Sequence, residues 1–504
     1  MFDNKTEVLK STKRLFIFAV ILFNVIGIGI IPLNLFLINM PEYISIIISI
    51  CLLCLNILLW MIVKQRKAGK IIIALFSIVS ILLSLFGTYC NPYWNSLVFR
   101  NSYSTMVKDD SLILTQKAAL EDLDYAMKYL QKLHPALYHE MPEELERQYE
   151  HSRQNLLNSE SIDLCMLAQE IESIFSLLHD GHTHVDASYH EWHYLKYIYE
   201  HNQAGDRLVK LNDMSLEELF HHNSNLISYE TDAWGLTHIY NYVSTAEGLR
   251  YLGISVEDGV KYTYEDVNGS EVSYIFTEED YITYPEYVEF NHIDTDTDVI
   301  TSFVSYVIDA ENDVAILTLD SCINNAEYRN CLNEMFTEIK QQGIQNIAVD
   351  LRNNGGGSSL VANEFFRFLN IDTYKSWGGA WRLGVFEIES SGETITNQKH
   401  DDLLFDGNLY LLTSVYTYSS AMDFAMFVKD NHMGEIIGEA SGNHPTSYGD
   451  IAFFTLPNSG IYMQISTKKW YRINQELGDQ VIEPDIPCDA DDAIEYLYDM
   501  IKKN

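Results

Sequence analysis

The segment 178–185, Leu-His-Asp-Gly-His-Thr-His-Val, concentrates residue types that can do chemistry. It holds His179, Asp180, His182 and His184 within six residues. Imidazole and carboxylate groups are common metal ligands. One imidazole could instead be a general base, because it titrates near neutral pH. A polar loop with solvent-facing histidines is the third interpretation, and the segment alone leaves all three open.

A triple glycine, Gly355-Gly356-Gly357, directly follows a run typical of a buried strand (347–351), and a helix is expected over 360–369. Glycine lets main-chain N–H groups approach a ligand closely. Such a turn can hold a phosphate or a developing oxyanion. Neither frame that is usual for a phosphate loop, Gly-Lys-Ser/Thr or Gly-x-Gly-x-x-Gly, is present in the sequence. A purely structural tight turn is the alternative.

The segment 413–425, Thr-Ser-Val-Tyr-Thr-Tyr-Ser-Ser-Ala-Met-Asp-Phe-Ala, places small hydroxyl residues between an expected strand (408–412) and an expected helix (420–429). A serine at such a point is most often only the N-cap of the helix. A strand-to-helix turn can also expose a nucleophilic serine beside the N–H groups of the helix end. Both interpretations stay open for this segment taken alone.

The surrounding sequence indicates how these segments are positioned. Residues 112–178 have apolar positions three and four apart, which predicts helices. Residues 189–298 are richer in aromatic and β-branched residues and contain turn signals at Asp258-Gly259 and Asn268-Gly269, which favours strands. From residue 313, strand and helix patterns alternate, beginning with a buried strand expected at 314–319, and this predicts an α/β arrangement with parallel strands.

Taken in order, the segments Asp-Gly-His-Thr, Asp-Leu-Arg-Asn-Asn-Gly-Gly-Gly and Thr-Tyr-Ser-Ser-Ala resemble those of the tail-specific (C-terminal processing) serine peptidase family. The sequence looks most like the branch with tricorn-type and retinoid-binding-protein-like members. Shorter segments also resemble the family, at 134–138, 437–439, 448–450, 456–460 and 483–486. The resemblance covers about residues 116–495.

The resemblance implies a crotonase-like α/β core with a helical N-terminal cap. Many relatives have a PDZ-like module between the cap and the core, and residues 207–219 resemble the end of such a module. We therefore expect a helical cap at 116–188 and a β-rich, PDZ-like middle region at 189–305. The α/β peptidase core is expected at 306–504.

Catalytic roles follow from the same resemblance. Ser419 takes the nucleophile position when the sequence is aligned on the Asp-Phe-Ala that follows, and Ser420 is the neighbour whose backbone N–H would face the oxyanion. A shift of one residue would exchange the two serines. Gly356 or Gly357 would supply the second oxyanion donor.

The identity of the base depends on the branch. Many family members use a lysine further along the chain, but here His444 occupies that position, and no lysine lies between Asp430 and Ile465. The tricorn-like branch uses the histidine of the His-Thr motif, which is His182 here. A neutral imidazole bonded to the serine can take its proton and later give it to the leaving amine. We expect His182 to be the base, with His444 as the alternative.

A late glutamate supports the site in the tricorn-like branch. Glu476 is the candidate for this role, and Glu439 is the second candidate. With His182 as the base, the reaction needs neither a metal nor another cofactor. We therefore expect none.

The first ninety residues differ in composition from the rest of the chain. Of the 504 residues 71 are acidic and 33 are basic, and the formal net charge of −38 argues against a nucleic-acid binder. Residues 1–90 have eight basic and three acidic groups, a net of +5, which leaves −43 on the remaining residues. Charge-free apolar runs at about 15–38, 44–63 and 71–88 are each long enough to cross a ~30 Å hydrocarbon layer, so we expect three transmembrane helices.

The basic residues predict an orientation for these helices. They precede the first run and fill the loop 64–70, whereas the loop 39–43 has none. By the positive-inside rule the N-terminus is cytoplasmic and the chain after Tyr89 is extracytoplasmic. We expect residues 1–90 to be a multi-pass anchor in the cell membrane and 91–115 to be a linker.

The leading functional hypothesis is a membrane-anchored serine endopeptidase that hydrolyses extracytoplasmic proteins or peptides. One alternative is a peptidase-like fold that binds a peptide or another ligand without turnover. The other is a metal-dependent hydrolase built on the histidine segment. The sequence identifies neither the substrate nor the oligomeric state.

Overall fold

The computed structural model describes most of the chain after residue 111 and parts of the segment before it. The described residues are 17–19, 21–22, 24–26, 42–62, 67–90, 112–186, 192–197, 200–202, 204–293, 302–383, 386–400 and 402–503. The chain divides into two compact units. Their bounds are Met1–Tyr103, Arg382–Ile388 and Ala452–Phe454 for the first, and Ser104–Trp381, Glu389–Ile451 and Thr455–Asn504 for the second.

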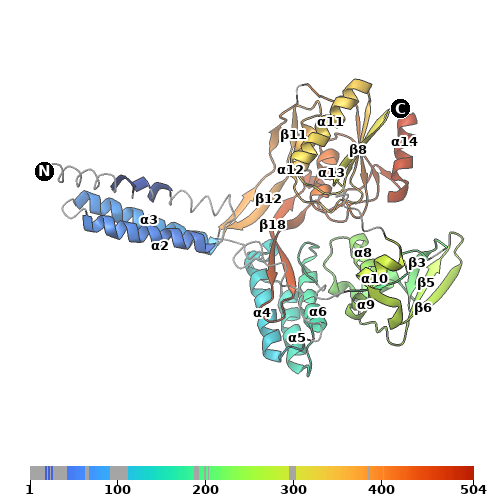
Figure 1. The fold of residues 1–504 in the computed structure, drawn as a ribbon, viewed down its shortest axis with the longest axis horizontal. Coiled ribbons are helices and arrows are strands. Elements are labelled where there is room, and N and C mark those ends of the chain that lie inside the picture. The colour runs from blue at the N-terminus through green and yellow to red at the C-terminus, as the bar shows by residue number, and fades with distance from the viewer. Residues whose placement is uncertain are drawn as a thin grey trace. The chain divides into compact units, whose positions relative to one another are not determined.

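Two helices of the first unit, α2 (Glu42–Ile62) and α3 (Lys67–Cys90), lie side by side (Figure 1). Apolar side chains pack between them. Asn56 of α2 is buried and exchanges two side-chain hydrogen bonds, of 2.8 and 2.9 Å, with Asn24. Apolar packing and paired amides therefore both join these segments.

The prediction of three transmembrane helices at 15–38, 44–63 and 71–88 is wrong. Among the described residues, no helix combines the length and the apolar character that a bilayer crossing needs. Freedom from charge is only one requirement, because a spanning segment must also form one continuous and sufficiently apolar helix. The predicted multi-pass placement in the cell membrane, with a cytoplasmic N-terminus, is wrong for the same reason. Much of the first run and of the linker 91–115 lies outside the described residues.

The second unit begins with a helical part, as the sequence predicts. Its helices are α4 (Gln116–Leu133), α5 (Glu143–Asn158) and α6 (Leu164–Phe175) (Figure 1). Thr115 and Asp163 cap α4 and α6, since each side chain accepts a backbone N–H of the first turn. The buried faces of both helices consist mainly of apolar residues three and four apart.

Two contacts hold this helical part against the C-terminal part of the same unit. Strand β1 (His184–Asp186) comes just after the histidine loop (179–183). It pairs antiparallel with β18 (Tyr462–Tyr471). Asp122 of α4 is fully buried and accepts backbone N–H groups of the turn before β18 at 2.9 and 2.7 Å. The histidine loop is thereby fixed relative to the C-terminal sheet.

Glu172 of α6 is buried beside β1. Its carboxyl group accepts the Ser228 hydroxyl at 2.6 Å and the Val185 N–H at 2.8 Å. Burial raises the pKa of Glu172 to about 7, although both hydrogen bonds oppose this rise. The unfolded chain releases this proton at a lower pH than the folded chain does. The stability contributed by Glu172 is therefore fully present below about pH 4.5 and is lost as the pH rises through about 7.

We expect the unfolding free energy to fall between pH 5 and pH 8 by an amount on the order of 3 kcal/mol because of Glu172. In Glu172→Gln the fall should be smaller, since the uncharged amide can accept the Val185 N–H and donate to the Ser228 hydroxyl. Urea unfolding of both proteins at the two pH values measures the difference. Equal falls would contradict the raised pKa.

The middle region contains an antiparallel sheet in the order β4-β3-β5-β6. Its strands are β3 (Arg207–Leu211), β4 (Met214–Ser215), β5 (Val260–Glu265) and β6 (Glu271–Phe276). The predicted turn at Asn268-Gly269 joins β5 to β6, with Gly269 at a φ of +80°. The other elements of this region are β2 (His193–Leu195), α7 (Leu216–Asn223), α8 (Asp232–Val243), α9 (Ala246–Tyr251), β7 (Tyr281–Thr283) and α10 (Tyr284–Phe290). The comparison with a PDZ-like module stays a prediction.

The C-terminal part is built on a sheet whose described strands have the order β19-β16-β15-β10-β9-β8. They are β8 (Val304–Asp309), β9 (Val314–Leu319), β10 (Asn346–Asp350), β15 (Asn408–Thr413), β16 (Glu435–Gly438) and β19 (Ile486–Pro487). Neighbouring strands are parallel except for the antiparallel pair β8 and β9. The α/β arrangement and the strands predicted at 314–319, 347–351 and 408–412 are confirmed.

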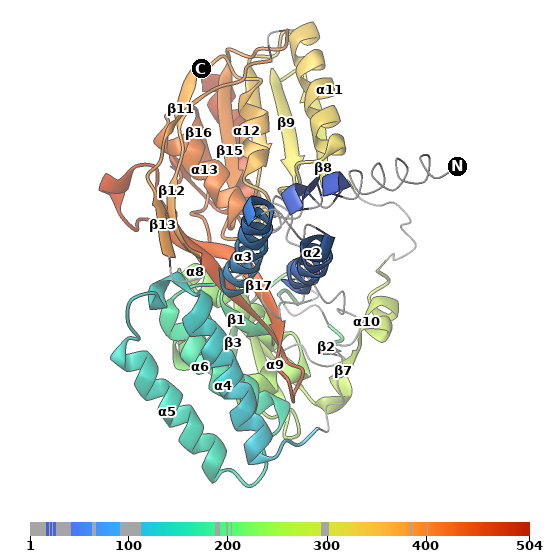
Figure 2. The ribbon, with the colours of Figure 1, turned by 90° about the vertical axis from the view of Figure 1, so that its left-hand side faces the viewer.

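Helices cover both faces of this sheet (Figures 1 and 2). They are α11 (Ala326–Gln342), α12 (Leu360–Phe366), α13 (Ser420–Asp430) and α14 (Ala493–Lys503). Strand residues face the two sides alternately. In β10, Ile347 and Val349 pack with α11, α12 and α13, whereas Ala348 packs with α14. The near-continuous apolar run of β10 is thus explained by burial on both faces.

The remaining strands include a separate antiparallel pair, β11 (Thr373–Lys375) and β14 (Thr394–Thr396). The others are β12 (Gly378–Leu383), β13 (Phe386–Ser390) and β17 (Ser447–Thr455). Within the second unit, residues 378–381 of β12 pair antiparallel with residues 468–471 of β18. β18 therefore links the histidine loop, through β1, to the C-terminal part of the chain.

Candidate active site

The glycine turn (351–359) and the serine turn (414–419) lie at the same edge of the parallel sheet. β10 and β15 are neighbours with Asp350 opposite Leu412, and each strand leads directly into one of the two turns. The Tyr418 N–H of the serine turn donates to the Asn354 carbonyl of the glycine turn at 3.0 Å. The carboxyl ends of parallel strands are the usual place of ligand sites in such sheets.

Ser419 lies at the sharp turn between β15 and α13. Its backbone has a φ of +55° and a ψ of −124°, a conformation that residues with a side chain rarely adopt. Asn443 Oδ1 accepts the Ser419 N–H at 2.8 Å and helps to hold this turn. In the described part of the chain, the partly exposed Ser419 side chain makes no capping bond to α13. Its hydroxyl is therefore not used as an N-cap.

Ser420 has a different environment. Its side chain is only 8% exposed, and its hydroxyl donates to the Gly357 carbonyl at 2.9 Å. Ser420 is the first residue of α13, so its backbone N–H has no acceptor within the helix. The Ser420 hydroxyl is thus used in the turn, whereas its N–H is directed away from the helix body.

Gly356 lies directly against the serine turn. A Cβ atom at this position would be 2.6 Å from Ser419 Cβ and 2.9 Å from Ser420 N. The backbone of Gly356 also has a φ of +103°, which favours glycine. Its own N–H donates to Asn354 Oδ1 at 2.9 Å. Gly356 therefore allows the two turns to approach, and its N–H already has an acceptor.

Gly357 differs from Gly356 in the use of its N–H. Its backbone bridges to Cys322, with the Cys322 N–H donating to the Gly356 carbonyl at 2.9 Å and the Ser358 N–H donating to the Cys322 carbonyl at 2.7 Å. This bridge uses the N–H and C=O groups on either side of Gly357, so the Gly357 N–H is not part of it. Gly357 is exposed, which leaves that N–H accessible to a ligand.

Alanine substitutions at two adjacent glycines should test this close approach. A Cβ at the exposed Gly355 would meet no described atom within 4 Å, whereas one at Gly356 would collide with Ser419. We expect Gly356→Ala to lower kcat by about 10²–10³-fold, because the nucleophile or the oxyanion donor must shift. Gly355→Ala should keep most of the activity. Steady-state peptide hydrolysis, with folding checked by circular dichroism, compares the two, and equal rates would show that the turn is only structural.

Asp180 anchors the histidine loop. It is fully buried, and its Oδ2 atom lies 3.1 Å from His134 Nε2 and accepts the Thr183 hydroxyl at 2.6 Å. His134 Nδ1 accepts the Ala136 N–H at 3.2 Å, so Nε2 carries the proton that is donated to Asp180. Burial raises the pKa of Asp180, but His134 and His182 outweigh burial and lower the pKa below its ordinary value. Asp180 is therefore an ionised carboxylate.

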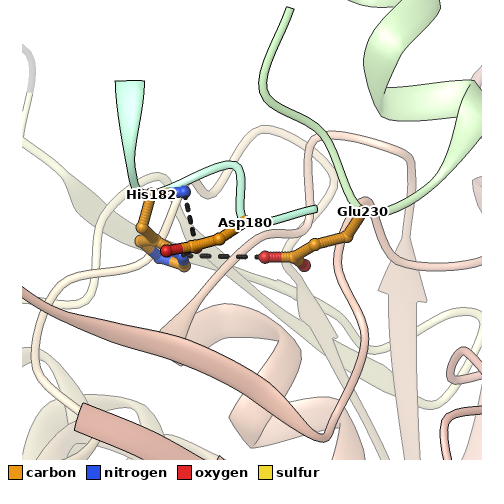
Figure 3. A group of neighbouring side chains, drawn as sticks. All are labelled: Asp180, His182 and Glu230. Atoms are coloured by element: carbon orange, nitrogen blue, oxygen red, sulfur yellow. Dashed lines mark hydrogen bonds and ion pairs between the residues drawn. The ribbon is translucent and has the colours of Figure 1, made fainter. Parts of the chain in front are cut away.

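His182 lies beside the serine turn. The centre of its ring is 4.9 Å from that of Tyr418, the residue before Ser419. Its Nδ1 atom is 3.6 Å from Asp180 Oδ1 and 3.9 Å from Glu230 Oε1 (Figure 3). Both ring nitrogens are buried, and among the described residues neither has a hydrogen-bond partner. The Asp180 carboxylate beside Nδ1 favours a proton on that atom, which leaves Nε2 as the acceptor.

Glu230, which the sequence did not indicate, is the second carboxyl group beside His182. It comes from the segment before α8, in the middle region. Its Oε2 atom accepts the His444 N–H at 3.1 Å, and its Oε1 atom accepts the Tyr418 hydroxyl at 3.4 Å. Burial raises the pKa of Glu230 well above its ordinary value, and the charge of Asp180 raises it further. No motif surrounds Glu230, so only the fold could have revealed it.

His444, the alternative base, is bound to the middle region. Its Nε2 atom is 3.1 Å from the Glu230 carbonyl oxygen. A carbonyl only accepts, so Nε2 carries the proton in this contact. The ring therefore holds the segment of Glu230 against the core, and its Nε2 atom is not free to accept a proton from a serine.

The two glutamates predicted from the sequence lie in other surroundings. Glu476 is exposed in the short helix η8 (Gln475–Leu477). Glu439 accepts the Val415 N–H at 3.1 Å and the Ala490 N–H at 3.3 Å. Glu439 thus holds the backbone of the serine turn in place.

The remaining histidines of the 178–185 segment have separate contacts. The ring of His179 lies edge-on to that of Tyr229, with centres 6.2 Å apart, and its backbone is left-handed with a φ of +48°. His184 Nδ1 is 3.1 Å from the Gly181 carbonyl oxygen. Within the described residues, the group whose metal-ligating atoms lie close together is instead Asp180, His182 and Glu230.

Comparison with solved structures finds chains of similar fold. Mature CPAF is similar with a TM-score of 0.54 and 12% identity, over 77% of this chain and 97% of that chain. The photosystem II D1 C-terminal processing protease covers 75% of this chain and 94% of its own, at 13% identity and a TM-score of 0.37. The tricorn protease covers 77% and 37%, at 14% identity and a TM-score of 0.38. The last two scores are too low to carry an argument, and no curated protein matches the sequence significantly.

The family comparison covers the C-terminal part of the chain. Residues 313–488 match peptidase family S41, and this range includes the glycine turn, the serine turn and β18. The likeness to CPAF shows the same mixed α/β fold. The resemblance that the motifs indicated is confirmed for this part of the chain. In its C-terminal part the chain is therefore similar to peptidase family S41.

Proposed function

We propose that the protein is a serine endopeptidase that hydrolyses peptide bonds of proteins or peptides with Ser419 as the nucleophile. The observation that carries this proposal is the geometry of Ser419. It sits in a strained turn without a capping bond, directly against Gly356, and follows the Tyr418 ring that contacts His182. The match of residues 313–488 to peptidase family S41 supports the same class of reaction.

In the first step, Ser419 Oγ attacks the carbonyl carbon of the scissile bond while His182 Nε2 takes the hydroxyl proton. Asp180 and Glu230 both lie beside Nδ1 of His182, and the negative charge of the ionised Asp180 favours the imidazolium that forms. The imidazolium gives its proton to the leaving amine, the carbon–nitrogen bond breaks, and an acyl ester remains on Ser419. Water then hydrolyses this ester by the same proton transfers in reverse.

The oxyanion of the tetrahedral intermediate needs two N–H donors. We assign these to Gly357 and Ser420, because the Gly356 N–H already donates to Asn354 and the bridge to Cys322 does not use the Gly357 N–H. Such main-chain donors stabilise charge only where it develops in the transition state. Glu476 as a supporting glutamate stays a prediction.

Cleavage of a library of unstructured peptides by the purified protein tests the proposal. Mass spectrometry should find new termini, with one ¹⁸O atom from labelled water in each new carboxyl group. Metal chelators should not abolish this activity, since no step uses a metal. Peptide binding without any cleavage would favour the non-catalytic alternative, and activity lost with a chelator would favour a metal-dependent hydrolase.

A further inference from the structure

Three metal-ligating side chains converge beside the base. Asp180 and His182 come from the histidine loop and Glu230 from the segment before α8 (Figure 3). One ligand atom of each lies within 4.8 Å of the other two. His182 Nδ1 is 3.6 Å from Asp180 Oδ1 and 3.9 Å from Glu230 Oε1.

The two separations from His182 Nδ1 nearly match those of a tetrahedral metal site. Zinc binds imidazole nitrogen and carboxylate oxygen at about 2.0–2.2 Å, so neighbouring ligand atoms of a tetrahedron lie roughly 3.3–3.5 Å apart. The distances from His182 Nδ1, 3.6 and 3.9 Å, exceed this only slightly. The ligand oxygens of Asp180 and Glu230 lie within 4.8 Å of each other. Side-chain shifts of roughly 1 Å or less would therefore close the site, with water as the fourth ligand.

The ligand atoms are already oriented, although Asp180 Oδ1 accepts the His182 backbone N–H at 3.0 Å and Glu230 Oε1 accepts the Tyr418 hydroxyl at 3.4 Å. His182 Nδ1 is buried and has no hydrogen-bond partner among the described residues. The other carboxyl oxygens are held by hydrogen bonds. His134 binds Asp180 Oδ2, and the His444 N–H binds Glu230 Oε2. Outer hydrogen bonds of this kind fix ligating carboxylates in metal sites.

The local charge favours a cation. Asp180 is ionised and fully buried, and its charge adds to the burial that keeps Glu230 protonated. Binding of a divalent ion would release the Glu230 proton to solvent, and the ion would then offset the charges of both carboxylates. Carboxylate and imidazole ligands together suit zinc and other first-row divalent ions.

We propose that Asp180, His182 and Glu230 bind a divalent transition-metal ion, with Zn²⁺ as the probe, and that this ion reversibly inhibits the peptidase. Coordination uses the lone pair of His182 Nδ1, so the proton of the neutral ring moves to Nε2. An Nε2 that carries a proton cannot take one from Ser419. The inhibition rests on the proposed role of His182 as the base, whereas the metal binding does not.

Zinc titration of Ser419→Ala by calorimetry tests the site without any dependence on hydrolysis. We expect one ion per chain, and Co²⁺ in its place should give the intense visible absorption of a tetrahedral site. Glu230→Gln, in the same background, should weaken zinc binding by at least about tenfold. His179→Asn is the matched control, because it removes another imidazole of the same loop and asparagine tolerates the left-handed backbone there. Its affinity should be unchanged.

Absence of zinc binding, or equal binding by Glu230→Gln and its parent, would overturn the site. If circular dichroism shows that Glu230→Gln is unfolded, His182→Gln replaces it and carries the same expectation. In the unmodified protein, zinc should inhibit hydrolysis with a midpoint equal to its dissociation constant, and a chelator should restore activity. Binding without inhibition would overturn the regulatory role. A protein that binds zinc but hydrolyses nothing would instead contradict the proposed function and leave the site standing.

Discussion

Ser419→Ala is expected to lower kcat for peptide hydrolysis by at least about 10⁴-fold, because covalent catalysis is lost with the hydroxyl. Alanine keeps the Cβ atom, so the strain of the turn at a φ of +55° is unchanged and the variant should fold. The measurement is steady-state hydrolysis of a peptide that the unmodified protein cleaves, with circular dichroism as the check on folding.

Ser420→Ala is the matched control for this experiment. It removes the hydrogen bond to the Gly357 carbonyl, which contributes about 1 kcal/mol to stability, but it keeps the backbone N–H. We expect it to keep at least a tenth of the activity. An active Ser419→Ala beside an inactive, folded Ser420→Ala would show that the two serines have exchanged roles.

His182→Ala is expected to abolish turnover, with a loss comparable to that of Ser419→Ala, since the two residues act as one unit. His444→Ala should keep most of the activity. The reason lies in their contacts: both nitrogens of His182 lack partners among the described residues, whereas His444 Nε2 donates to the Glu230 carbonyl. The backbone N–H of residue 444, which binds the Glu230 carboxyl group, survives the substitution.

The pH profile of hydrolysis tests independently which of these two histidines is the base. An imidazole base loses function when it is protonated, so kcat/KM should fall on the acidic side of neutrality in the unmodified protein and in His444→Ala alike. A folded but inactive His444→Ala beside an active His182→Ala would refute the assignment of the base.

Local patterns predicted the core of the molecule well. Apolar runs bounded by turns correctly indicated β9, β10 and β15, because strands buried on both faces are apolar throughout. The triple glycine follows β10 and the paired serines follow β15. These two strands are parallel neighbours, so the two turns lie at the same edge of the sheet. The choice between Ser419 and Ser420 could not be made from the pattern, since it depends on one backbone φ and one hydrogen bond.

The roles of Glu230 and His134 could not be predicted, because they depend on contacts between distant parts of the chain. Glu230 reaches His182 only because the middle region folds back on the core, and nothing in its neighbouring residues signals this. His134 lies in a segment that resembles the family, but its bond to Asp180 joins residues 46 positions apart. The transmembrane prediction failed because charge-free length alone does not meet the requirements for a spanning helix.

The most direct test of the central claim is to locate the residue that a fluorophosphonate probe modifies. Such probes react with a serine hydroxyl that a nearby base activates. Fragmentation of the labelled peptide distinguishes Ser419 from Ser420. We predict one adduct per chain on Ser419, and none on this residue in His182→Ala. Labelling of Ser420, or no labelling of a folded protein, would contradict the account.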